Sequence, residues 1–150
     1  MDKSERTKDY YRDKKCVMLG VNGTSENTRI EIDHKDGRKN DARVSGQETQ
    51  RLEDFQPLCK AANDVKRQIC KRCKESNKRW SAKNISGNPY DFYEGGEDYD
   101  AALGCQGCYQ YDPVEYRRRS TERIINEDSR HKAECIMQKL YGDITTEGTV

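Results

Sequence analysis

The sequence has few of the residues from which a large hydrophobic core is built. Leu, Ile, Val and Phe together account for 21 of its 150 residues. This share is below the roughly 20% under which a chain of high net charge is expected to be disordered. Its net charge is only +1, because 28 basic residues nearly balance 27 acidic ones. We therefore expect one small folded domain whose thin core is stabilised by other means.

Long apolar segments are also absent. No run approaches the roughly 20 residues needed to cross a bilayer, and the first residues, MDKSER, lack the apolar segment of a signal peptide. We expect a soluble, cytoplasmic protein without a membrane partner. In that compartment an odd number of cysteines, seven here, fits metal binding better than a disulfide framework.

Four of these cysteines form two Cys-x-x-Cys pairs, which are Cys70 with Cys73 and Cys105 with Cys108. Each such pair can hold one edge of a tetrahedral zinc ion, and four thiolates leave no position open for water. The pattern predicts a structural Zn²⁺ site that supports folding. A redox-active pair is the alternative, but a thioredoxin-like strand and helix context is missing. The other three cysteines have no predicted role: Cys16, Cys59 and Cys135.

The chain divides into three predicted regions: a loose arm over 1–14, a core over 15–116, and a helical extension and tail over 117–150. Within the core, residues 28–33 alternate between polar and apolar, which predicts a strand. A second short element over 52–58 precedes a helix over 60–73, in which Ala62, Val65 and Ile69 recur at helical spacing. Residues 77–104 are rich in glycine and acidic residues and predict an irregular segment.

A last helix is predicted to begin at Asp112-Pro113-Val114-Glu115, which supplies an N-cap, a proline at the first helical position and a glutamate at the third. We expect this helix to break near 126–129, to resume from Ala133 and to end at Gly142.

Histidine is scarce, with only two in the chain. His131 lies in a charged helical stretch, where an exposed and inert role is expected. His34 follows Asp33 at the end of the predicted strand, and Asn63 lies on the predicted helix after it. An isolated Asp-His dipeptide usually does no more than end a strand, so its meaning depends on the surrounding segments.

Three of those segments, IEIDH at 30–34, LEDFQPLC at 52–59 and NDVKR at 63–67, resemble in order and spacing the HNH, or ββα-metal, nuclease motif. With its later cysteine pairs, the chain looks most like the HNH type II restriction endonucleases. The core motif covers 17–73, and the cysteine pairs extend the similarity to about 116. This resemblance implies an α+β fold, with a small ββα-metal core, a four-cysteine zinc module and a C-terminal helix.

The resemblance also implies roles for individual residues. His34 matches the general base that takes a proton from water, and Asp33 and Asn63 match ligands of a catalytic Mg²⁺ or Mn²⁺. Asp54 stands where the family usually has an asparagine that orients the histidine, and a carboxylate could also hold the imidazole N–H. Cys59 lacks the second cysteine that many relatives place three residues later, so we expect a buried thiol.

Basic residues concentrate between Lys66 and Lys83, where eight lie against the single acid Glu75. Such a run can either contact phosphates or form a solvated helix face, and both interpretations remain open. The predicted DNA-binding residues are Arg38, Lys66, Arg67, Lys71 and Arg72. The partner we expect is double-stranded DNA, and because a symmetric site is cut by two catalytic units, we also expect a homodimer.

The sequence therefore predicts a metal-dependent HNH endonuclease that hydrolyses DNA phosphodiester bonds, and most specifically a type II restriction endonuclease. Two alternatives remain open. One is a non-catalytic, zinc-dependent DNA-binding module in which His34 is incidental. The other is an HNH homing or nicking nuclease, with the same active site but cutting one strand or a long asymmetric target.

Overall fold

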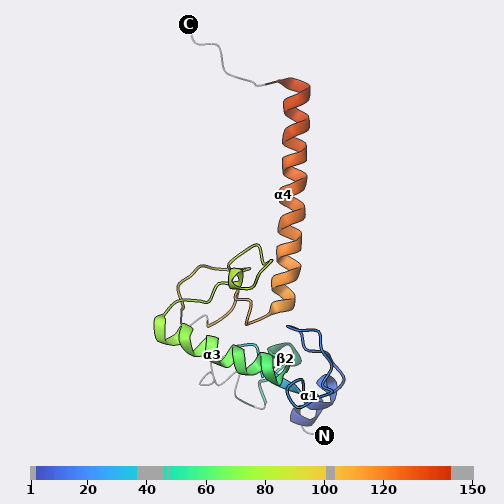
Figure 1. The fold of residues 1–150 in the computed structure, drawn as a ribbon, viewed down its shortest axis with the longest axis vertical. Coiled ribbons are helices and arrows are strands. Elements are labelled where there is room, and N and C mark those ends of the chain that lie inside the picture. The colour runs from blue at the N-terminus through green and yellow to red at the C-terminus, as the bar shows by residue number, and fades with distance from the viewer. Residues whose placement is uncertain (1–2, 37–45, 47, 101–103, 143–150) are drawn as a thin grey trace.

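The computed structural model describes residues 3–36, 46, 48–100 and 104–142. Its helices and strands, in chain order, are α1 (Lys3–Tyr11), β1 (Ile30–His34), β2 (Phe55–Cys59), α3 (Lys60–Ser76) and α4 (Pro113–Tyr141). Single 3-10 turns cover Leu52–Asp54 and Ala82–Asn84. The predicted α+β class is confirmed. As Figure 1 shows, α1, the strands and α3 gather at one end, and α4 extends away from them.

The two strands form one antiparallel sheet, with Ile30 opposite Cys59 and His34 opposite Phe55. All five residues of β2 are buried, whereas those of β1 are half-buried. The end of β2 passes directly into α3, because Cys59 is the N-cap residue of that helix. The predicted order of strand, loop, strand and helix is therefore confirmed, and it places the end of β1 beside the first turns of α3.

Helix α3 buries only part of the face that apolar spacing predicted, since Ala62 is buried as expected. Val65 is 54% exposed, while the buried positions include Asn63, Lys66 and Cys73. Polar side chains can face inward here because partners on β1 satisfy them. The helix also runs three residues past its predicted end and stops at Asn77, whose left-handed backbone (φ 55°) closes the last turn.

The N-terminal segment, predicted as a loose arm, contains helix α1. No apolar periodicity indicated a helix there, and its attachment depends mainly on one residue. The hydroxyl of Tyr11 is buried and donates to the carbonyl oxygens of Leu52 (2.7 Å) and Phe55 (2.9 Å). Its burial raises the pKa of the Tyr11 hydroxyl above the usual value. The segment is thus docked against the residues that lead into β2.

Among the described residues the buried apolar side chains include two small clusters, in keeping with the thin composition. The first contains Cys16, Leu58, Cys59 and Ala62, and the second contains Ala82, Tyr109 and Tyr116. Met18 packs against both clusters and joins them. Tyr109 and Tyr116 meet edge to face with ring centroids 5.3 Å apart, so tyrosine rings supply much of the apolar area that aliphatic residues would otherwise provide.

The segment between the cysteine pairs is irregular, as predicted, and Arg79 holds it together. Its guanidinium donates to the carbonyl oxygens of Glu94 (3.1 Å), Gly96 (3.2 Å) and Gln106 (3.0 Å). It also lies over the ring of Phe92, 4.5 Å from the centroid. One cation therefore organises a loop that contains little regular hydrogen bonding of its own.

Gly107, within the second cysteine pair, allows this loop to approach closely. Its φ is +93°, and an added Cβ would meet the carbonyl oxygen of Glu94 at 2.0 Å. Gly107→Ala is therefore expected to lower the unfolding free energy by roughly 2 kcal/mol or more beyond the left-handed backbone cost alone.

Gly87 provides the matched control for that experiment. Its φ of +91° is nearly the same, but nothing lies within 4 Å of the added Cβ. Thermal unfolding of both alanine variants separates steric clash from backbone strain. Equal losses at Gly87 and Gly107 would contradict the close approach.

Helix α4 starts and ends where the sequence predicts. Asp112 caps it by accepting the backbone N–H of Glu115 (3.0 Å), and Gly142 follows its last residue. The predicted break near 126–129 is wrong, because the helix is continuous through that stretch. Successive ion pairs along one turn stabilise it there, namely Arg123 with Glu127 (3.0 Å) and Asp128 with Lys132 (2.8 Å).

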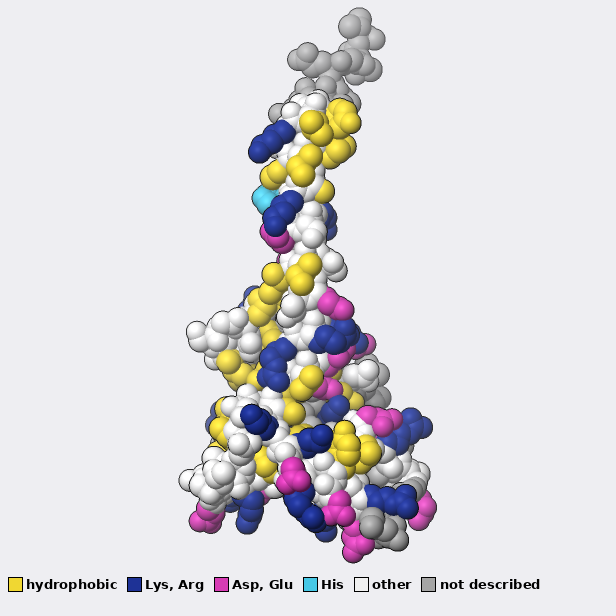
Figure 2. All heavy atoms as spheres, turned by 90° about the vertical axis from the view of Figure 1, so that its right-hand side faces the viewer, with side chains coloured by type: hydrophobic (Ala, Val, Ile, Leu, Met, Phe, Trp, Pro, Cys, Tyr) yellow, Lys and Arg dark blue, Asp and Glu magenta, His cyan; other side chains and the backbone are white. Residues whose placement is uncertain are grey.

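The outer half of α4 is solvated on all sides. Figure 2 shows apolar side chains near its end, where Ile136, Met137 and Leu140 are all more than half exposed. In the part of the chain that the structure describes, no helix combines the length and apolarity needed to cross a membrane.

Candidate active site

His34 is the last residue of β1, and two neighbours set the position of its ring. Phe55, opposite it in the sheet, contacts the imidazole with ring centroids 4.5 Å apart at an angle of 57°. The side-chain nitrogen of Gln50 lies 3.3 Å from His34 Nε2. If the Gln50 amide N–H donates to Nε2, Nε2 is the unprotonated ring nitrogen. This contact therefore favours the tautomer in which Nε2 can accept a proton.

Asp33 faces helix α3 and forms an ion pair with Lys66. The same carboxylate oxygen accepts from Gln56 Nε2 at 3.0 Å. Lys66 is only 3% exposed, and its ammonium also donates to the backbone carbonyls of His34 (2.9 Å) and Lys35 (3.1 Å). The buried lysine thus balances the charge of Asp33 and fixes the chain just after β1.

Asn63 lies one helical turn before Lys66 on α3. Its amide nitrogen donates to the carboxylate of Glu31 at 2.6 Å. Its amide oxygen is buried and accepts no hydrogen bond, and the same is true of Gln56 Oε1. Buried acceptors without donors are uncommon in folded proteins. Two such oxygens, one on the residue that binds Asp33 and one on the residue that binds Glu31, are therefore a distinctive feature of this site.

The strand separates the predicted site residues into two groups. Successive side chains of a strand point to opposite faces, so Glu31 and Asp33 point toward α3, while Ile32 and His34 lie on the other face. Asp33 and His34, expected to act together, therefore lie on opposite faces of β1. Gln50, Gln56 and Glu31 were not predicted as site residues, although the two-residue spacing of Glu31 and Asp33 indicates their shared face.

Asp54, which the resemblance places as the residue that orients the histidine, ends the short turn before β2. Its carboxylate accepts the backbone N–H of Arg51 at 2.9 Å and so caps the short turn before β2. Gln50, in the loop before that turn, contacts His34 Nε2 and is a second candidate for orienting the ring.

The residues predicted to contact DNA lie in different environments. Lys66 is buried with its ammonium fully engaged, so its expected phosphate contact does not fit its location. Arg67, Lys71 and Arg72 are exposed on the outer face of α3. Arg38 lies outside the described residues.

The two Cys-x-x-Cys pairs come together although 31 residues separate Cys73 from the next cysteine, Cys105. A hydrogen bond with Cys105, together with burial, raises the pKa of Cys70. Burial and the nearby Cys105 raise the pKa of Cys73, and burial, with Cys105 and Cys73 close by, raises that of Cys108 to about 11. Within the described residues no group of three or more His, Cys, Asp or Glu is arranged to hold a metal ion.

The remaining paired thiols are Cys16 and Cys59, which are 1% and 0% exposed. They pack in the same apolar cluster. Burial raises the pKa of Cys59. Cys59 is a buried thiol, as predicted, and its partner comes from far earlier in the chain.

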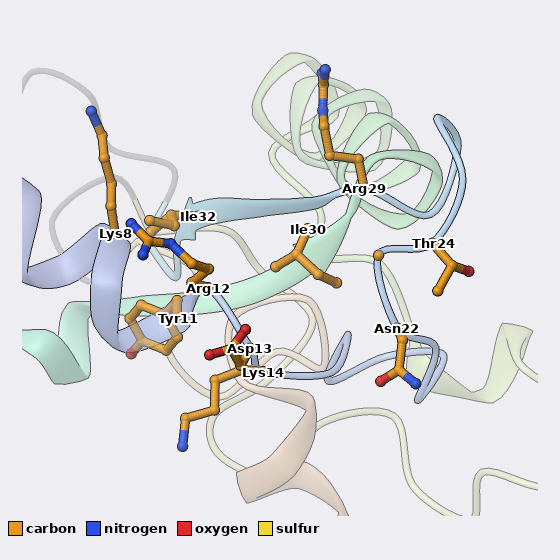
Figure 3. Close-up of a pocket in the computed structure, with 11 residues that line it drawn as sticks. Lys8, Tyr11, Arg12, Asp13, Lys14, Asn22, Thr24, Arg29, Ile30 and Ile32 are labelled. Atoms are coloured by element: carbon orange, nitrogen blue, oxygen red, sulfur yellow. The ribbon is translucent and has the colours of Figure 1, made fainter.

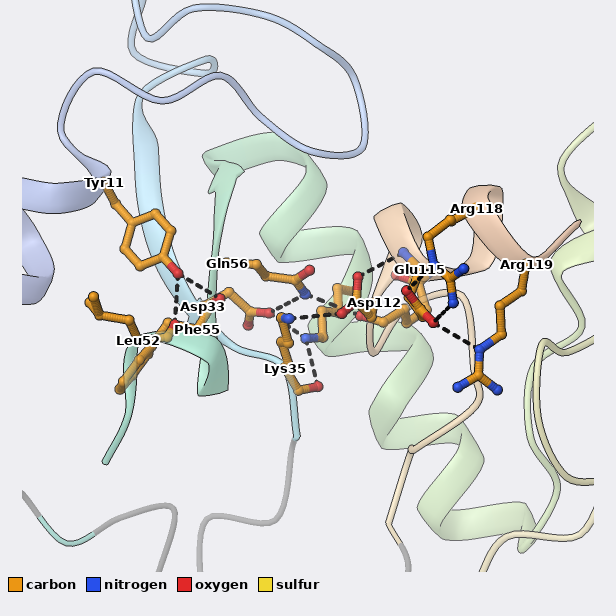
Figure 4. A network of polar contacts seen from close by, with 12 residues as sticks. Tyr11, Asp33, Lys35, Leu52, Phe55, Gln56, Asp112, Glu115, Arg118 and Arg119 are labelled. Atoms are coloured by element: carbon orange, nitrogen blue, oxygen red, sulfur yellow. Dashed lines mark hydrogen bonds and ion pairs between the residues drawn. The ribbon is translucent and has the colours of Figure 1, made fainter. Parts of the chain in front are cut away.

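A network of polar contacts connects β1 and β2 to the start of α4 (Figure 4). Gln56, bound to Asp33, also donates to the carbonyl oxygen of Gln110 at 3.3 Å. Lys35 forms a 2.7 Å ion pair with Asp112, the N-cap of α4. The segment that follows Cys108 is therefore tied directly to the two strands that carry the site.

Comparison with known proteins identifies relatives of this chain. A family model described as ICEA Protein matches residues 2–141. A curated protein of Neisseria lactamica, described as Type II restriction enzyme NlaIII, is 70% identical over 134 residues, which cover 89% of this chain and 58% of that protein. The chain thus spans less than two thirds of the length of this relative. No solved structure matches it.

Proposed function

Since the chain belongs to the ICEA protein family and is similar to a type II restriction enzyme, we propose that it is an endonuclease that hydrolyses phosphodiester bonds in double-stranded DNA. We assign it to the HNH class. The observation that supports this assignment best is the arrangement at the end of β1, where His34 lies on one face while Asp33 and the unpaired amide oxygen of Asn63 lie on the other.

His34 is the proposed general base. The side-chain amide of Gln50 lies within hydrogen-bond distance of His34 Nε2. A water molecule that displaced this amide could donate a proton to the same nitrogen. Contact with Phe55 restricts the ring, so that little reorientation is needed when a proton is transferred.

Asp33 and Asn63 are the proposed ligands of a divalent cation, Mg²⁺ or Mn²⁺. These ions prefer oxygen ligands, and the amide oxygen of Asn63 has no other donor. When bound, the cation supplies positive charge that stabilises the scissile phosphate as negative charge develops on it. Lys66 forms an ion pair with Asp33 and holds the end of β1 in position.

The four cysteines of the two pairs are the proposed ligands of a structural Zn²⁺. Their thiols lie in one neighbourhood and shift one another's pKa, and four sulfur donors suit a closed tetrahedral site. Because zinc binds thiolates, its binding would release the protons that the raised pKa values retain in the metal-free protein.

The exposed cations Arg67, Lys71 and Arg72 on α3 are proposed phosphate contacts. Cutting both strands of a symmetric site requires two catalytic units, so the proposed assembly is a homodimer. Sedimentation of the protein with a duplex would test it, with two chains per duplex as the expected stoichiometry.

The two metals are expected to be separable. Brief EDTA treatment should abolish plasmid cleavage, and added Mg²⁺ should restore it, because oxygen ligands exchange a hard cation readily while four thiolates retain zinc. Zinc content, measured on the same samples, should stay near one per chain.

Cleavage at full rate in EDTA would contradict the roles of Asp33 and Asn63. DNA binding without cleavage under any divalent cation would instead support the non-catalytic zinc module. The ratio of nicked to linear plasmid distinguishes a nicking enzyme from one that cuts both strands.

A further inference from the structure

A cavity of about 560 Å³ lies between helix α1 and the face of β1 that points away from α3. Basic side chains surround it: Lys8, Arg12 and Lys14 come from α1 and the turn after it, and Arg29 precedes β1. Figure 3 shows these side chains together with Ile30 and Ile32, which also line the cavity.

The charge of this lining is strongly positive. Among the described residues, four cations and one acid, Asp13, line the cavity. Acidic neighbours partly neutralise two of the cations, since Arg12 pairs with Asp9 and Arg29 lies 3.5 Å from Glu31. The other two are lysines, and within the described residues neither forms an ion pair with a carboxylate. A basic cavity of this kind suits an anionic ligand.

The position of the cavity relative to His34 indicates which anion. Ile30 and Ile32 line the cavity. His34 follows them on the same face of β1, because side chains two residues apart in a strand share a face. From Ile30 to His34 the strand spans about 13 Å. One DNA strand carries a phosphate per ~3.4 Å of helix axis, so the cavity and the proposed base are about four phosphates apart at most.

We propose that the groove formed by Lys8, Lys14, Ile30 and Ile32 binds the phosphodiester backbone of the DNA duplex next to the strand that His34 cleaves. This inference rests on the proposed function. It assigns DNA contact to the N-terminal segment, on the opposite side of β1 from the basic run of α3. The buried Lys66 leaves α3 with fewer available cations than its sequence suggests.

The test is the salt dependence of duplex binding by a Lys8→Ala/Lys14→Ala variant. Fluorescence anisotropy with a 30-base-pair duplex of mixed sequence, in EDTA to prevent cleavage, gives the affinity between 50 and 200 mM salt. Each lost phosphate contact should reduce the slope of log affinity against log salt by about 0.9, or about 1.8 for two, with binding weakened tenfold or more.

An Arg6→Ala/Lys15→Ala variant is the matched control, because it removes the same charge from exposed positions of the same segment that do not line the cavity. If the wild type binds and cleaves the duplex but the two variants have equal slopes of log affinity against log salt, the proposed DNA contact at the groove is wrong and the proposed function stands. A wild type that neither binds the duplex nor cleaves it would overturn the proposed function, and the groove with it. Displacement of the duplex by millimolar inorganic phosphate at constant ionic strength would indicate a single-phosphate site and would also overturn the proposal.

Discussion

Replacing His34 with alanine is expected to slow DNA cleavage at least ~100-fold while DNA affinity and zinc content stay at wild-type levels. A positioned general base typically contributes a factor of ~100 or more, and the half-buried imidazole has no part in either cysteine pair or in the basic surfaces. The measurement is a time course of plasmid cleavage in Mg²⁺, together with duplex binding in EDTA.

The second histidine offers the control for this experiment. His131 is exposed on the outer part of α4, so His131→Ala should cleave at the wild-type rate. Since the His34 ring contacts Phe55, the thermal midpoint of the His34 variant should be recorded to show that it is folded. Cleavage above a tenth of the wild-type rate in folded His34→Ala would count against its role as the base.

The second large effect concerns the cysteines. Cys105→Ser is expected to unfold the part of the domain around the cysteine pairs and to release its zinc. The buried residues of the apolar cluster beside it are Ala82, Tyr109 and Tyr116, with Met18, Trp80 and Tyr93 packed against them. A cluster of this size is too small to offset the entropy of ordering the irregular segment. A structural zinc site can contribute ~10 kcal/mol or more to folding.

Trp80 is the best reporter of that unfolding. It is the single tryptophan of the chain, it packs against the tyrosine cluster, and Cys108 Sγ lies 3.8 Å from its carbonyl oxygen. Its emission should shift to longer wavelength in Cys105→Ser. Far-ultraviolet dichroism is less informative, because ion pairs along the exposed α4 can maintain that helix by themselves.

Cys135→Ser is the matched control, since this cysteine lies on the outer half of α4, away from both apolar clusters. It should keep its zinc and its Trp80 emission. If Cys105→Ser also kept both, Cys105 would be removed from the ligand set.

The parts of the fold that depend on local patterns could be predicted from the sequence. Alternation over 28–33 indicates β1, and the Asp112-Pro113 pair indicates the start of α4. Both follow from interactions within a few residues. The break predicted in α4 was wrong because ion pairs one turn apart outweigh the weak helix propensity of Asn126 and Ser129.

The parts that depend on tertiary partners could not be predicted. Lys66 looked like one more cation of a basic run, and only the folded chain reveals Asp33 and two carbonyls around its ammonium. Helix α1 has no apolar stripe, and the burial of Tyr11 against residues more than 40 positions later determines where it lies. The basic cavity between α1 and β1 exists only because α1 packs there, so it could not be predicted from the sequence.

The sequence predicted candidate site residues but not how they are arranged in the fold. Asp33 and His34 are the last two residues of β1, and Asn63 lies near the start of α3, where its amide nitrogen donates to Glu31 rather than to either of them. Their distribution over two faces, and the contacts of Gln50 and Gln56, depend on a loop and a register that no local pattern encodes.

The most direct test of the central proposal is incubation of supercoiled plasmid with the purified 150-residue chain in Mg²⁺, followed by sequencing of the DNA ends. We predict linear products whose ends all lie at one short sequence, with no product from the His34→Ala variant. Plasmid that stays supercoiled although the folded, zinc-containing chain binds it would contradict the account, as would equal cleavage by the wild type and the variant.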